Sequence, residues 1–306
     1  MLCQFTAKNY KSIREEMTFN MQAAAIMEHR DRIIETKDGE KFLLVSVIYG
    51  PNGGGKSEYE IKDRKISVEP FAFSEETRKE PTQFEVFFRT DAAEYRYILH
   101  MRQDFVMHDS LDRIKLDTGR RSALFVRNGS EVDLKGGFGK IKISGEISEN
   151  LPLLSYLGIT YKRNEIISDV IQCNKKLFGL LPFRAKSLVA GTTLVIDGLD
   201  AKVYPVLLQR VVMLYNNMEI NKNGAQLIFT SHDLSTMNND VFRRDEIWFA
   251  AKGKNQNSKL YSLVEFKNTK GESVRMDAKY DKQYLEGKYG ADPYLKKIID
   301  WSEVNA

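Results

Sequence analysis

The chain has 306 residues, of which 42% are hydrophobic and 29% charged, a composition that allows one large core or two modest ones. The formal net charge of +4 is only mildly basic, so charge alone does not indicate a nucleic-acid partner. The two cysteines, Cys3 and Cys173, form no CxxC pair, so the sequence suggests neither a zinc site nor a disulfide framework, and two thiols suit a reducing cytoplasm. Nowhere do 18 apolar residues run together, and residues 1–21 have no apolar signal core, so we expect a cytoplasmic protein without a membrane span.

The first 50 residues predict a short hairpin and then a buried strand. Residues 2–7 are typical of a strand, and residues 18–21 are its expected hairpin partner. Residues 42–49 are almost wholly apolar and rich in β-branched side chains, and Gly50 and Pro51 follow them directly. This pattern predicts a strand that is buried on both faces.

A different pattern occupies the next part of the chain. Short β-rich runs at 84–89, 95–101, 123–127 and 140–144 are separated by turn residues, among them the hairpin signal Asn128-Gly129. We expect an antiparallel meander here. The domain prediction is therefore a discontinuous core of residues 1–70 and 150–306, with residues 71–149 as a β-rich insertion.

From residue 150 the pattern alternates between helices and strands. Helices are expected at 151–159, 165–181 and 203–218, and strands at 193–196, 225–230, 245–250 and 260–264. Such alternation predicts an α/β fold with a parallel sheet that helices cover on both faces.

A phosphate-binding loop follows the buried strand. The pattern G-x-x-x-x-G-K-[ST] is matched without a gap by Gly50, Pro51, Asn52, Gly53, Gly54, Gly55, Lys56 and Ser57. Glycines let the backbone direct its N–H groups at phosphate oxygens, the lysine reaches the β- and γ-phosphates, and the serine hydroxyl ligates Mg2+. We therefore expect a P-loop NTPase that binds ATP with Mg2+; the alternative is a glycine-rich surface turn.

Two later segments carry polar residues at the ends of predicted strands. Asp197 ends the apolar run 194–196, where an aspartate of a phosphate-loop fold holds Mg2+; a turn or capping role is the alternative. Asp200 follows three residues later and is a candidate helix cap. His232 lies in the turn after the strand 225–230, where it can approach the γ-phosphate, and a purely structural histidine is the alternative.

These three elements, in this order and spacing, resemble the ABC-type ATPase heads of the SMC and RecF kind. The chain is more similar still to the AAA_15 group of bacterial ATP-binding proteins, which includes abortive-infection and RloA-like anti-phage ATPases. The resemblance is carried by residues 5–13, 49–57, 194–205, 221–233, 243–249 and 284–291. It implies an ABC-type head with a mixed or parallel sheet, ATP and Mg2+ as cofactors, and a homodimer that sandwiches two nucleotides between its nucleotide faces.

The chain departs from the family pattern at two positions that serve hydrolysis. The family places a water-polarising glutamate after the Walker B aspartate, and this chain has Gly198 there. Loss of a general base costs about 10²–10⁴ in rate. The family's Ser-Gly-rich signature is also replaced, by Gln172, Cys173 and Asn174. The phosphate-binding half is therefore intact, and the hydrolytic half is damaged.

Three hypotheses follow. In the first, the chain is an ATPase head with slow or impaired hydrolysis that acts as a switch in phage defence or DNA maintenance, coupled to an effector nuclease or to DNA. In the second, it is a non-hydrolysing ATP-binding module. In the third, it binds DNA or RNA through a basic face made of Arg120, Arg121, Lys135 and Lys140, for which a solvated loop surface is the simpler explanation.

Overall fold

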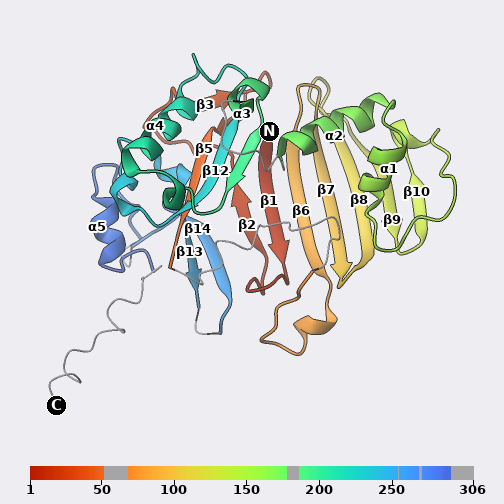
Figure 1. Cartoon of the computed structure of the whole chain (residues 1–306), viewed down its shortest axis with the longest axis horizontal. Coiled ribbons are helices and arrows are strands. Elements are labelled where there is room, and N and C mark those ends of the chain that lie inside the picture. The colour runs from red at the N-terminus through yellow and green to blue at the C-terminus, as the bar shows by residue number, and fades with distance from the viewer. Residues whose placement is uncertain (52–67, 178–185, 254, 269–270, 291–306) are drawn as a thin grey trace.

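Two β-sheets of different kinds lie side by side in the computed structural model of the chain (Figure 1). The structure describes residues 1–51, 68–177, 186–253, 255–268 and 271–290. The larger sheet has seven strands in the order β10-β9-β8-β7-β6-β1-β2, and all its pairs are antiparallel. Its strands are β1 (Leu2–Lys8), β2 (Met17–Asn20), β6 (Thr82–Arg89), β7 (Ala93–Arg102), β8 (Phe105–Lys115), β9 (Arg121–Asn128) and β10 (Glu131–Leu134).

The smaller sheet has five strands in the order β11-β12-β5-β13-β14. The first four run parallel to one another and β14 is antiparallel, so the sheet is mixed. Its strands are β5 (Val45–Tyr49), β11 (Thr193–Ile196), β12 (Gln226–Ser231), β13 (Ile247–Lys252) and β14 (Ser258–Ser262). A separate hairpin is formed by β3 (Ile33–Glu35) and β4 (Lys41–Leu43).

Helices cover only parts of these sheets. Near β6 to β9 lie α1 (Leu153–Thr160) and α2 (Glu165–Leu177), whereas α3 (Lys186–Ala190), α4 (Pro205–Asn216) and α5 (Tyr280–Leu285) lie beside the five-stranded sheet (Figure 1). Leu208, Val211, Val212 and Tyr215 on α4 share a core with Val47 and Phe229, at the spacing of one helix face. On the far face of the same sheet, Ile48, Ile228 and Trp248 belong to the core of the seven-stranded sheet.

The expectation of helices on both faces of the parallel sheet is therefore met only in part by the described residues, where α2 contacts chiefly the edge strand β11. The second face of the parallel sheet packs mainly against the seven-stranded sheet. The ring centroids of Phe19 on β2 and Trp248 on β13 lie 5.0 Å apart there. Apolar strands buried on both faces require an apolar neighbour on each side, and a second sheet meets that requirement as well as a helix layer does. The coarser prediction of an α/β fold with a mixed sheet and an antiparallel β-rich segment is confirmed.

Most predicted elements are present with shifted boundaries. The run 42–49 is divided into β4 and β5 by Leu44, and every residue of β5 is buried. The hairpin at Asn128-Gly129 joins β9 to β10, and Gly129 adopts the φ of +57° that such a turn requires. The run 140–144 is not a strand. Because β1 and β2 share a sheet with β6 to β10, the division at residues 71 and 149 stays a prediction.

Candidate functional site at the carboxyl ends of the parallel strands

Three adjacent parallel strands end at the same edge of the five-stranded sheet. Their register places Ile196 of β11 beside Phe229 of β12, and Ser231 of β12 beside Tyr49 of β5. The residues that follow these strand ends are Asp197, His232 and Gly50, so the structure brings together one residue from each predicted motif. In open α/β sheets this edge is the usual place for a ligand.

The phosphate loop is described only at its first two residues. The other predicted phosphate-binding residues, 52–57, lie outside the described part of the chain, and this includes Lys56 and the predicted metal ligand Ser57. Gly50 itself passes close to β13, and a Cβ atom built on it would lie 2.4 Å from the carbonyl oxygen of Ala250. Packing between two strands therefore requires a glycine at position 50, whatever the loop binds.

Asp197 lies in a turn that hydrogen bonds tie to β12. Its side chain is exposed, and its Oδ1 accepts a hydrogen bond from the Thr230 hydroxyl at 2.5 Å. The same hydroxyl accepts from the backbone N–H of Gly198 at 2.7 Å, and the Thr230 carbonyl accepts from the N–H of Leu199 at 3.2 Å. Gly198 has a φ of +61°, a left-handed conformation that glycine adopts without strain.

His232 begins the turn that follows β12. The residue is exposed, and its backbone N–H donates to Oδ2 of Asp200 at 2.9 Å. Asp200 therefore joins the two turns. It is not a helix cap, because it is the first residue of the short helix η3 (Asp200–Lys202). The N-cap position belongs to Leu199, whose side chain makes no capping hydrogen bond. Asp233 accepts from the N–H of Ser235 at 3.0 Å, which fixes the far side of the histidine turn.

Tyr49 lies beneath this edge and is not among the predicted site residues. It is fully buried, and its hydroxyl lies 3.2 Å from Oγ1 of Thr236. Burial raises the pKa of the Tyr49 phenol well above its usual value, and the charges of Asp233 and Asp200 raise it further, so the phenol stays protonated. An aromatic residue next to a phosphate loop is the only sequence signal for this position.

Thr230 is likewise outside the predicted set. A threonine near the end of a predicted strand can have many structural roles, so its position in the sequence alone does not identify it as a site residue. Its role becomes visible only through its two hydrogen bonds to residues 197 and 198.

The described residues contain no ready-made metal site. Within them, no three His, Cys, Asp or Glu side chains are grouped closely enough to hold a metal ion. Asp197 nevertheless fits one position of a magnesium site, because it is exposed and Thr230 engages only one of its two carboxylate oxygens. Mg2+ is commonly held by one or two protein ligands together with phosphate oxygens and water.

Comparison with known proteins gives little more. No protein-family model matches the chain, and no curated protein matches it in sequence. Among solved structures, it is similar to the SMC head domain from Thermotoga maritima, with 14% sequence identity and a TM-score of 0.36, over 85% of this chain and 98% of that chain. A similarity this low bears on neither the fold nor the function of this chain. No helix in the described residues has the length and apolar character to cross a membrane.

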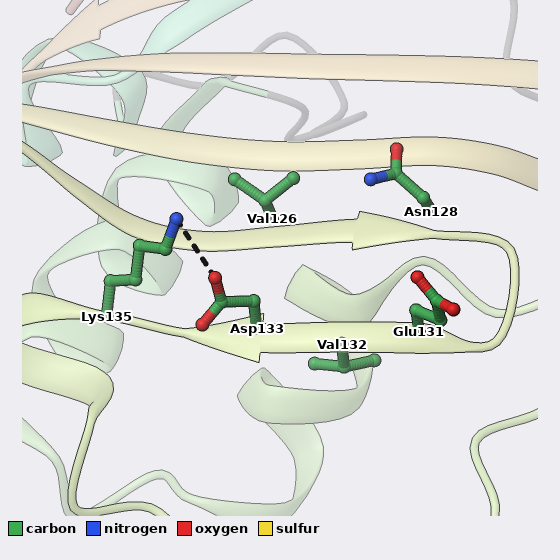
Figure 2. A pocket seen from close by; sticks show the side chains of 6 residues that line it. All are labelled: Val126, Asn128, Glu131, Val132, Asp133 and Lys135. Carbon is green, nitrogen blue, oxygen red and sulfur yellow. Dashed lines mark ion pairs between the residues drawn. The ribbon is translucent and has the colours of Figure 1, made fainter.

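A shallow pocket lies at the far edge of the seven-stranded sheet. Figure 2 shows its lining, which comes from β9, β10 and the residue after them: Val126, Asn128, Glu131, Val132, Asp133 and Lys135. Lys135 is paired there with Asp133 at 2.9 Å, and Arg121 on β9 is paired with Asp112 at 2.6 Å. Two of the four residues of the postulated basic face are thus offset by carboxylates, which weakens the case for nucleic-acid binding through it.

Proposed function

We propose that the chain binds ATP with Mg2+ at the carboxyl edge of β11, β12 and β5, as an ABC-type ATPase head with slow or impaired hydrolysis. One observation carries the proposal: β5 leads directly into the loop 50–57, and the neighbouring strands deliver Asp197 and His232 to the same edge. The loop, the acidic turn and the histidine turn are far apart in sequence, and a chance match of the loop pattern does not account for their meeting.

In this proposal each residue has a limited task. Lys56 and the loop amides bind the phosphates, and Ser57 and Asp197 are the protein ligands of Mg2+. A bound Mg2+ ion offsets the charge of the phosphate oxygens. In this proposal His232 contacts the γ-phosphate, and the histidine turn is then the element that distinguishes the triphosphate from the diphosphate.

The biological role that we attach to the site follows the family resemblance. It is a cytoplasmic nucleotide switch in phage defence or DNA maintenance, in which two copies pair through their nucleotide faces and act on an effector nuclease or on DNA. The second candidate is an ATP-binding module without turnover. The left-handed Gly198 favours it, because neither a side chain nor an ordinary backbone conformation is present where the family has its glutamate.

The first experiment measures Mg·ATP binding by calorimetry and phosphate release on one preparation. Lys56→Ala is expected to weaken binding at least about tenfold, since a hydrogen bond to a charged group contributes about 1.5–3 kcal/mol. Lys37→Ala is the matched control, because Lys37 is an exposed lysine in the loop between β3 and β4. Binding without release above the Lys56→Ala level would favour the module, and release lost in Lys56→Ala would establish an ATPase. No binding by the parent chain would overturn the proposal.

A further inference from the structure

The hydroxyl of Thr230 joins the acidic turn to the sheet. We infer that Thr230 is a positioning residue for Asp197, and that its hydroxyl sets the direction in which the Asp197 carboxylate meets a magnesium ion. This inference rests on the proposed function, because it assigns a task within the same site.

The hydrogen-bond chemistry fixes the roles of the three groups. The Gly198 N–H can only donate, so the Thr230 hydroxyl accepts at 2.7 Å and its own proton is free to go elsewhere. That proton is directed to Oδ1 of Asp197 at 2.5 Å. One carboxylate oxygen is thereby engaged by the protein, and Oδ2 is left for a metal ion or water.

Thr230 is itself held rigidly. It is 7% exposed, so water does not readily replace its hydroxyl, and it lies on β12 between β11 and β5 with Ile48 as its neighbour in register. Its branched Cβ restricts side-chain rotation, and its carbonyl also accepts from Leu199. A rigid donor on a central strand gives Asp197 a fixed orientation that an exposed carboxylate would otherwise lack.

The same turn is fastened at its other end to the histidine turn. One hydrogen bond joins Thr230 to Asp197, and a second joins the His232 N–H to Asp200, three residues after Asp197. Segments 197–200 and 230–232 are therefore hydrogen-bonded to each other at both of their ends, and we expect them to move as one unit. A displacement of Asp197 then also displaces His232, and this couples the metal side of the site to the phosphate side.

The test compares Thr230→Val, which has nearly the shape of threonine but no hydroxyl, with Thr230→Ser, which keeps the hydroxyl. ATP binding is titrated with Mg2+ and again with excess chelator, and the ratio of the two affinities is the first readout. The second readout, amide hydrogen exchange of Gly198, needs no nucleotide. Thr6→Val is the matched control, because Thr6 is a buried threonine on β1 of the other sheet whose hydroxyl hydrogen-bonds the Thr18 hydroxyl on β2.

We expect Thr230→Val to reduce the magnesium-dependent gain in ATP affinity about threefold to tenfold and to leave the metal-free affinity within about twofold of the parent. Gly198 exchange should accelerate at least about tenfold, since its N–H loses a buried acceptor. Thr230→Ser should restore both readouts, and Thr6→Val should change neither. If Thr230→Val keeps the parent's magnesium dependence, or if Gly198 exchange is unchanged, the role of Thr230 is wrong while ATP binding stands. If the parent chain does not bind ATP, both proposals fail.

Discussion

Gly198 directly follows Asp197, where the resemblance to ABC-type ATPases leads us to expect a glutamate, and its backbone does not favour a glutamate there. Its φ is +61°, and residues other than glycine lose about 1–2 kcal/mol in the left-handed region. A Cβ atom at this position would meet the Cβ of Ala201 at 3.9 Å, an ordinary contact, so the cost arises from the backbone and not from crowding. Introducing a glutamate there therefore carries a conformational penalty that the sequence alone does not reveal.

This penalty gives a prediction for Gly198→Glu. We expect the free energy of unfolding to fall by about 1–2 kcal/mol and phosphate release to stay within about twofold of the parent, because the strained turn also holds Asp197. Gly198→Asn should lose less stability, since asparagine tolerates the left-handed region better. Urea unfolding and phosphate release measure the two effects. A rise in release that disappears when Lys56→Ala is added would contradict the prediction and identify a damaged ATPase.

Helix α1 depends on a buried carboxylate of the neighbouring sheet. Asp109 on β8 is fully buried and accepts a hydrogen bond through Oδ2 from the N–H of Leu153, the first residue of α1. Next to it on β9, the Arg127 guanidinium donates to the carbonyl of Leu151 at 2.7 Å. Burial raises the pKa of Asp109 to about 6, and the contacts with Leu153, Tyr97 and Arg127 offset only part of that rise.

The raised pKa predicts how stability depends on pH. Between about pH 4 and pH 6 the unfolded chain ionises Asp109 while the folded chain keeps it protonated, so this group lowers stability as pH rises through that range. Asp109→Asn should remove this contribution, and its stability relative to the parent should increase by roughly 1–3 kcal/mol from pH 4 to pH 7. Thermal unfolding at several pH values measures it. A parallel pH profile for the two proteins would contradict the assignment.

The same elements show how far a single sequence predicts this structure. The apolar runs at 193–196 and 225–230 were sufficient for β11 and β12, and hence for the edge that carries Asp197 and His232. Strand β8 was not predicted, because Asp109, Ser110, Asp112 and Arg113 interrupt its apolar pattern and only the fold shows that Asp109 faces a helix end. Roles that consist of contacts between distant residues, such as that of Thr230, leave no local signal.

At the scale of the whole molecule, one buried side chain links the two sheets. Gln226 on β12 accepts through Oε1 from the Leu2 N–H at 2.7 Å and from the Thr193 hydroxyl at 2.9 Å. Its Nε2 donates to the carbonyls of Leu2 at 3.0 Å and Leu43 at 3.1 Å. The side chain is fully buried, and both ends of its amide are used: they bond to β1 of the seven-stranded sheet, to β11 of the parallel sheet and to β4 of the separate hairpin.

Gln226→Leu tests whether the sheets unfold together. It removes these four hydrogen bonds and leaves buried polar groups unpaired, so we expect a loss of about 2–4 kcal/mol, whereas Gln22→Leu at an exposed position should change stability by less than about 0.5 kcal/mol. Urea unfolding can be followed by the fluorescence of Trp248, which lies where the sheets meet, once the second tryptophan has been removed by Trp301→Phe in every variant. Strand β1 and the apolar core that the two sheets share connect residues 71–149 to the parallel sheet. A single unfolding transition in the parent chain would therefore mean that residues 71–149 depend on the parallel sheet for their stability. Two transitions in the parent, or full stability in Gln226→Leu, would instead make the seven-stranded sheet a unit that folds without the proposed nucleotide-binding edge.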